Sequence, residues 1–183
     1  MSHDFHESLA KSHAAEDLPL WEAVYRKAFW NFQGMFNHRQ DGDHQRLGVD
    51  RTVVLNTGKT LAIDEKIRFQ DYGDILLEYM SNEQRRVPGW VCKPLACDFI
   101  AYAVAPSGIC YLLPVLALQS AWRSNQSTWI GRARSSSCPT YREVRADNGT
   151  YITLSIALPI PDLFSAMGQA LRITFDKSLG VVA

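Results

Sequence analysis

Charged side chains gather inside an otherwise apolar part of the chain, the segment Leu47–Phe69. Asp50 lies near its start, and Asp64, Glu65 and Lys66 follow an apolar run near its end. Because residues i and i+2 of a strand share a face, Asp64 and Lys66 are expected to point together, while Glu65 points to the other side. Two carboxylates beside one ammonium are suited to metal-assisted hydrolysis of a phosphodiester.

A predicted hairpin positions these residues. Leu47–Leu55 and Thr60–Phe69 are strand-like runs, and residues 56–59 (NTGK) between them form a short Asn/Gly turn. Antiparallel pairing of the two runs would bring Asp50 close to Asp64 across the strands.

The carboxylates of Asp50 and Asp64 suit a hard divalent cation such as Mg²⁺, which prefers oxygen ligands and keeps several waters. A metal-bound water has a lowered pKa, and the cation offsets negative charge that develops on a phosphoryl oxygen. Lys66 would position or deprotonate the attacking water, or stabilise the transition state. The three residues together predict a phosphodiesterase site.

This pattern, GVD at 48–50, a turn, and IDEK at 63–66, resembles the active-site signature of the PD-(D/E)xK nuclease superfamily. The superfamily includes restriction endonucleases and archaeal-type Holliday junction resolvases, and the segment is most similar to the resolvase-like branch. The separation of 14 residues (64 − 50) falls in the usual range of the superfamily. No proline precedes Asp50, and Asp64 stands where glutamate is commoner.

The resemblance implies roles for particular residues. Asp50, Asp64 and the backbone carbonyl of Glu65 would bind Mg²⁺ or Mn²⁺, and Lys66 would be catalytic. Glu22, on the predicted helix before the first strand, would be an auxiliary acidic residue of the site. The implied substrate is DNA, and many relatives dimerise to cut both strands, so a homodimer is also expected.

The whole chain predicts an α/β fold with a single mixed β-sheet flanked by helices. From about Asp17 to Leu158 the expected order matches the α-β-β-β-α-β core of the restriction endonuclease-like fold that the resemblance implies. The expected elements are a helix over 17–36, a loop over 37–45, strands over 47–55, 60–69 and 74–80, a hairpin of 98–105 with 109–113, a helix over 115–125, an exposed loop over 124–148, a strand over 151–158 and a helix over 161–171.

A basic feature occupies the second half of the chain, with Trp129 and Tyr141 interleaved among its arginines. Arginines near aromatic rings can hold a nucleic-acid backbone or a splayed base. A solvated basic loop explains the same pattern equally well. The candidate DNA-binding residues are Arg123, Arg132, Arg134, Arg142 and Arg145.

The composition limits the classes of protein that fit. The 183 residues are 46% hydrophobic and 21% charged, which excludes disorder as the main state. Nineteen basic and nineteen acidic residues give no net charge, which excludes a histone-like basic coat. The halves differ, because residues 1–92 carry 11 basic and 14 acidic side chains and residues 93–183 carry 8 and 5.

Other candidate residues have simpler interpretations. The four cysteines are too sparse for a disulfide scaffold and lack the paired spacing of a zinc site. His38 and His44 lie in a polar loop without a recognised metal spacing. Glu78, on the third predicted strand, either reaches the same site or is a strand-edge glutamate.

Residues 1–16 are expected to form a flexible tail, and residues 17–183 a single nuclease-like domain. The N-terminus lacks the apolar run of a signal peptide, and the uncharged run Phe99–Trp122 is interrupted by turn residues. We therefore expect a cytoplasmic protein without a membrane segment.

Two other functions remain open at this level. The chain could be a non-catalytic inhibitor or adaptor that binds protein or nucleic acid with a nuclease-like fold, because a fold does not determine a function. It could also be a structural homodimer that associates through the apolar region Phe99–Trp122. The complete set of Asp50, Asp64 and Lys66 favours the enzyme.

Overall fold

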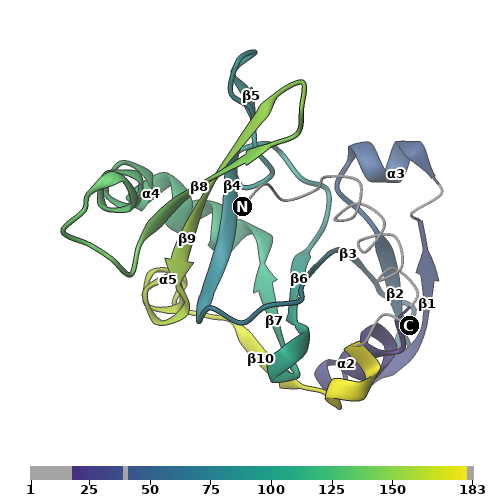
Figure 1. Ribbon diagram of the computed structural model, residues 1–183. Helices are drawn as coiled ribbons and strands as arrows, with labels where there is room; N and C mark the ends of the chain where they lie inside the picture. The colour runs from purple at the N-terminus through teal and green to yellow at the C-terminus, as the bar shows by residue number, and fades with distance from the viewer. Residues whose placement is uncertain (1–17, 39–40, 181–183) are drawn as a thin grey trace. The chain divides into compact units, whose positions relative to one another are not determined.

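The computed structural model describes residues 18–38 and 41–180, which form two compact units (Figure 1). Residues 18–71, 95–115 and 170–180 make up what we call the six-stranded unit, and residues 72–94 and 116–169 make up the four-stranded unit. The predicted tail, residues 1–16, lies outside the described residues. The α/β class is confirmed, but the prediction of a single sheet is wrong, because the described strands form two sheets.

The sheet of the six-stranded unit is mixed, with the strand order β1-β2-β3-β6-β7-β10 (Figure 1). All its neighbouring strands are antiparallel except β3 and β6, which run parallel. Its strands are β1 (Phe32–Asn37), β2 (Arg51–Leu55), β3 (Thr60–Arg68), β6 (Phe99–Val104), β7 (Ile109–Pro114) and β10 (Leu171–Thr174).

Helix α2 (Leu20–Ala28) covers one face of this sheet. Its buried residues recur at helical spacing, and they pack against apolar side chains of β2, β3, β6 and β7 in one core cluster. The helix ends at Phe29, whose φ of −120° and ψ of 100° are extended. The expected helix over 17–36 is therefore too long, since residues 32–37 form β1 and pair with β2.

The predicted hairpin is confirmed, although its first strand begins at Arg51 and not at Leu47. β2 pairs antiparallel with β3, with Arg51 opposite Ile63 and Thr52 opposite Ala62. Gly58 in the connecting turn has a φ of +78°, a conformation that glycine adopts without steric cost. The second predicted hairpin is also present, as β6 and β7. Between β1 and β2 lies a short helix, α3 (Gly42–Arg46), where the sequence indicated only loop.

The four-stranded unit contains an antiparallel sheet with the order β5-β4-β9-β8 and two helices. The strands expected over 74–80 and 151–158 are present, but they pair with each other here and not with the hairpin of the other unit. The elements are β4 (Asp74–Asn82), β5 (Val87–Pro88), β8 (Arg142–Asp147), β9 (Ile152–Pro159), α4 (Val115–Arg134) and α5 (Ile160–Met167).

Two expectations for this part of the chain need correction. The loop expected over 124–148 begins with the second half of α4, and Trp129 on that helix is buried, with 4% of its surface exposed. The same expected loop ends in strand β8. Polar Ser, Asn and Gln side chains favoured a loop in the sequence, but on a helix with one buried face these residues can point to solvent.

The uncharged run Phe99–Trp122 forms strand β6, a turn, strand β7 and the first part of α4, as expected. In the described part of the chain, none of the helices combines the length and the hydropathy that a membrane span needs.

Gly89 tests the packing of the four-stranded unit. A Cβ at this position would overlap the carbonyl group of Glu78 and lie 2.8 Å from the backbone nitrogen of Met80. We expect Gly89→Ala to lower the free energy of unfolding by about 1–3 kcal/mol, the usual cost of overpacking. Chemical denaturation of the purified variant measures this difference.

Gly131 is the matched control, because it lies inside α4 and a Cβ there would meet no atom within 4 Å. Gly131→Ala should raise the free energy of unfolding by up to about 1 kcal/mol through helix propensity. Equal effects of the two substitutions would contradict the described path of the chain at Gly89.

Candidate active site

The hairpin of β2 and β3 brings Asp50 to the backbone of β3. The amide of Asp50 donates to the carbonyl oxygen of Ile63 at 2.9 Å, and the Oδ2 atom of Asp50 accepts from the amide of Glu65 at 2.8 Å. The Asp50 carboxylate therefore lies at the edge of β3 next to Asp64. The predicted approach of the two aspartates across the hairpin is present in the structure.

Asp64 and Lys66 lie on the same face of β3, as the strand alternation predicted. The Nζ atom of Lys66 donates to Oδ1 of Asp64 at 3.0 Å. The side chain of Asp64 is 8% exposed and that of Lys66 is 26% exposed. The pair is therefore mostly shielded from water on the Asp64 side and more open on the Lys66 side.

The surroundings of Asp64 disfavour its negative charge. Burial raises the pKa of Asp64 to about 6, the Asp50 carboxylate adds to this rise, and the Lys66 ammonium opposes it. Two carboxylates share this space with one ammonium, and together they carry a net negative charge when both are ionised. A divalent cation would relieve their repulsion.

Glu65 points to the opposite face, into the core below α2. Arg51 binds its carboxylate through two hydrogen bonds, of 2.6 and 3.1 Å, and the Tyr25 hydroxyl donates to it at 2.6 Å. Arg51 and Glu65 are each about 5% exposed. Burial and the nearby Glu65 raise the pKa of Tyr25 well above its ordinary value, so the phenol keeps its proton.

The backbone of Glu65 faces the side where Asp50 lies. Its amide donates to Asp50, and the N–H and C=O of one strand residue point toward the same neighbouring strand. The carbonyl oxygen of Glu65 should therefore point to the same side as the Asp50 carboxylate. This direction suits the metal-ligand role that the resemblance implies for it, which stays a prediction.

The structure does not bring Glu22 to these residues. Glu22 lies on α2, and Tyr25 of the same helix packs on the Glu65 side of β3. Asp64 and Lys66 point to the opposite face of β3. The Glu22 side chain is 47% exposed and pairs with Arg26 one turn along the helix at 2.6 Å. An exposed i,i+4 pair is the simpler account of this residue.

The five candidate DNA-binding arginines belong to the four-stranded unit, and four of them bind acidic or phenolic groups of that unit. Arg142 pairs with Asp74 at 2.9 Å and Arg145 with Glu83 at 2.6 Å. Arg134 pairs with Glu143 at 2.8 Å, Arg132 donates to the Tyr141 hydroxyl at 3.1 Å, and Arg123 is exposed.

The aromatic rings between these arginines are buried. Trp129 and Tyr141 are 4% and 6% exposed, so neither offers a face on which a base could stack. Glu78, the other candidate acid, lies on β4 of the same unit, opposite Ser155 of β9. DNA binding by the arginines thus stays a prediction.

The cysteines agree with the expected structural role. All four are free, and Cys97 and Cys110 are buried. Burial raises the pKa of the Cys97 thiol to about 12, and the nearby Asp64 carboxylate adds to this effect. Cys97 is therefore a neutral thiol at ordinary pH and a poor metal ligand.

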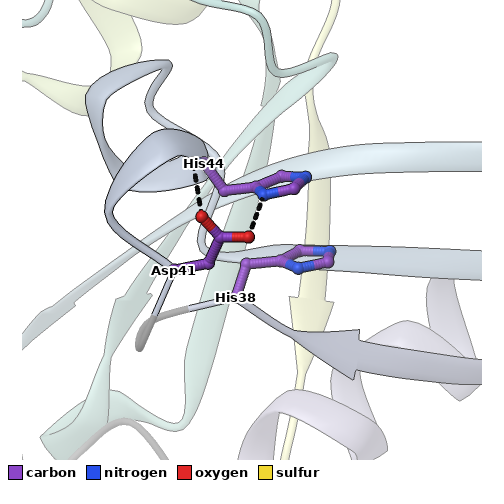
Figure 2. Close-up of side chains that lie close together, drawn as sticks. All are labelled: His38, Asp41 and His44. Atoms are coloured by element: carbon purple, nitrogen blue, oxygen red, sulfur yellow. Dashed lines mark hydrogen bonds and ion pairs between the residues drawn. The ribbon is translucent and has the colours of Figure 1, made fainter.

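A cluster that the sequence analysis did not identify lies between β1 and β2. His38, Asp41 and His44 place one possible ligand atom each within 4.8 Å of the others (Figure 2). The spacing of three residues between successive members was visible in the sequence. The turn that brings the His38 side chain onto the start of α3 was not.

Comparison with protein-family models, with curated proteins and with solved structures finds no match in any of the three.

The raised pKa of Asp64 predicts how stability depends on pH. The folded state binds this proton more tightly than the unfolded state, in which the pKa is near 3.8. The tighter binding of this proton stabilises the folded state below about pH 4. This stabilisation is lost as the pH rises to about 6, so the free energy of unfolding falls by up to about 3 kcal/mol. Urea unfolding of wild type and Asp64→Asn between pH 4 and 7, in EDTA, measures the difference.

The Asp64→Asn variant has no such proton, so its free energy of unfolding relative to wild type should increase over this pH range. A difference that is constant from pH 4 to 7 would show that Asp64 has an ordinary pKa.

Proposed function

We propose that this protein is a divalent-metal-dependent nuclease that hydrolyses phosphodiester bonds in DNA. The observation that carries the proposal is the convergence of Asp50, Asp64 and Lys66 at one end of the β2–β3 hairpin. These are the three residues of the D…DxK pattern that the PD-(D/E)xK resemblance selects. They come together while Glu65, between two of them in sequence, is held in the core.

The donor set fits Mg²⁺ or Mn²⁺. It consists of two carboxylates and, by its direction along β3, the carbonyl oxygen of Glu65, which are the hard oxygen ligands that these ions prefer. The electrostatics of Asp64 also fit. Burial raises the pKa of Asp64 and the Asp50 carboxylate adds to the rise, and a bound cation would stabilise the ionised form of both carboxylates. When bound, such an ion lowers the pKa of water and offsets charge on the phosphoryl group.

The protein's own residues would divide the remaining work. Asp50, whose carboxylate accepts from a backbone amide, provides a fixed negative group at the start of β2. Lys66, oriented by its 3.0 Å hydrogen bond to Asp64 and partly exposed, provides a positive charge for the scissile phosphate or for orienting water. Both functions depend on positioning by strand backbone, which holds side chains more precisely than a loop does.

The restriction endonuclease-like core is proposed only for part of the chain. The described part of the six-stranded unit starts with helix α2 and three antiparallel strands, β1, β2 and β3, with the short helix α3 between β1 and β2, and it places β6 beside β3. Residues 69–98 between β3 and β6 contain strands β4 and β5 and no helix. This unit could thus provide the α-β-β-β part of the expected order, although with partly different residues from those expected. The helix that should follow the third strand is not found between β3 and β6.

Cleavage assays on the full chain test the proposal. Plasmid, linear, branched and single-stranded DNA, and RNA, would be incubated with Mg²⁺ or Mn²⁺ and with EDTA. We expect metal-dependent cleavage by wild type and a loss of about 100-fold or more in Asp64→Asn and Lys66→Ala, the range typical of a lost acid–base or charge-stabilising group.

Lys59→Ala is the matched control, because Lys59 is an exposed lysine in the turn of the same hairpin. It should cleave at the wild-type rate. If folded wild type cleaves none of these substrates and its melting temperature does not respond to Mg²⁺ or Mn²⁺, the nuclease proposal is wrong. A non-catalytic binding function would then be the better account of the fold.

A further inference from the structure

The side chains of His38, Asp41 and His44 are held together by the backbone around them. His38 directly follows β1, and its amide donates to the carbonyl oxygen of Asp50 at 2.8 Å, which extends the β1–β2 ladder by one residue. The amide of Asp41 donates to the carbonyl oxygen of His38 at 2.8 Å. This turn brings Asp41 and the start of α3 next to the end of β1.

Asp41 connects this turn to α3. Its Oδ1 atom accepts from the amides of Asp43, at 2.9 Å, and His44, at 3.4 Å, which satisfies donors at the start of the helix. Its other oxygen, Oδ2, lies 2.8 Å from Nδ1 of His44. One carboxylate therefore orders the backbone with one oxygen and faces an imidazole with the other.

The two imidazole rings lie parallel, with a centroid distance of 4.1 Å and an angle of 7° between the ring planes. Figure 2 shows the Asp41 carboxylate at the side of this stack, between the Cβ atoms of His38 and His44. Each residue offers one ligand atom, and these three atoms lie within 4.8 Å of one another. Ligands of a tetrahedral zinc ion lie about 3.4 Å apart, from Zn–N bonds of about 2.1 Å, so on binding the three atoms would move closer and the two rings would turn out of their parallel stack until both lone pairs point to the ion.

A further contact orients His38. Its Nε2 atom lies 2.8 Å from the hydroxyl of Thr52 on β2. Metal-binding histidines commonly use their second ring nitrogen in this way, which fixes the tautomer and the ring orientation. With Nε2 donating to Thr52, Nδ1 of His38 keeps its lone pair for a metal.

The donor types of the cluster also suit a metal. Two imidazole nitrogens and one carboxylate are a donor set for zinc and similar first-row transition metals, whereas Mg²⁺ prefers oxygen ligands throughout.

We propose that His38, Asp41 and His44 form a binding site for a transition-metal ion of the Zn²⁺ class, separate from the carboxylate site of Asp50 and Asp64. The ligand atoms are Nδ1 of His38, Oδ2 of Asp41 and Nδ1 of His44. Three protein ligands leave one position of a tetrahedral ion for water or another ligand. This site does not depend on the proposed nuclease function.

The position of the site gives it a structural consequence. Thr52 pairs with Ala62, and strand alternation places both on the face of the sheet that carries Asp64. His38 is also joined through its backbone to Asp50. A metal bound here would tie the β1–α3 connection to the strand end that carries Asp50.

Metal binding to the full chain, first stripped with EDTA, tests this proposal. Zn²⁺ binding would be measured by calorimetry, and Co²⁺ binding by the visible absorption of tetrahedral cobalt. We expect one equivalent of metal per chain in wild type. Thr52→Val should weaken binding by about 10–100-fold, the usual effect of losing an outer hydrogen bond, and His44→Gln should weaken it more.

Three variants separate this site from other sources of binding. Asp41→Asn keeps an oxygen for the helix-start contacts but loses the charge, so it should fold and bind metal weakly. The combined variant His3→Gln, His6→Gln and His13→Gln removes the chain's other histidines and should bind like wild type. Asp64→Asn should also bind Zn²⁺ like wild type.

Two results would overturn the proposal. One is wild-type protein that takes up no equivalent of Zn²⁺ or Co²⁺ at micromolar concentrations. The other is binding that His44→Gln and Asp41→Asn leave unchanged while the variants remain folded by circular dichroism, because the metal would then lie elsewhere.

Discussion

The buried ion pair of Glu65 with Arg51 is the interaction on which the six-stranded unit depends. The pair is bidentate, the Tyr25 hydroxyl adds a third hydrogen bond, and both charges are almost fully removed from water. A shift of β3 by one residue would leave the Arg51 charge unpaired in the core, at a cost of several kcal/mol. The pair therefore sets the register of β3, and through it the outward direction of Asp64 and Lys66.

The two faces of β3 thus handle charge in opposite ways. On the core side, Glu65 meets a guanidinium and a phenol that stabilise its ionised form. On the other side, burial raises the pKa of Asp64 to about 6, and the neighbouring Asp50 carboxylate adds to this rise while Lys66 opposes it. One strand therefore carries, in adjacent positions, an acid paired with arginine inside the core and an acid that shares its space with a second carboxylate and one lysine. A raised pKa of this kind, at a site where polar groups converge, is typical of functional residues.

The sequence predicted this site because its determinants are local. A short Asn/Gly turn sets the hairpin, and period-two alternation separates Asp64 and Lys66 from Glu65. The ion pair of Glu65 with Arg51 follows from the same register but was not predicted, because an arginine at a strand position is usually exposed.

Features that depend on distant pairing were not predictable in the same way. The strands over 74–80 and 151–158 were predicted, but their pairing in a second sheet was not, because the sequence pattern of a strand does not show which other strand it pairs with. The helix expected over 17–36 ends early because residues beyond Phe29 pair with β2. The cluster of His38 and His44 needed a turn that three-residue spacing alone does not indicate.

The division of the chain into two units has a consequence for how the protein can fold. Within residues 18–180 the chain passes between the units four times, after residues 71, 94, 115 and 169, so neither unit is a continuous segment. The parallel pairing of β3 with β6 closes a loop of residues 69–98. The pairing of β10 with β7 likewise needs residues 171–174, near the end of the described chain. Such non-local closure slows folding. We expect the two sheets to assemble interdependently. During synthesis, neither sheet can be completed until the last third of the sequence, which contains β8, β9 and β10, has been made.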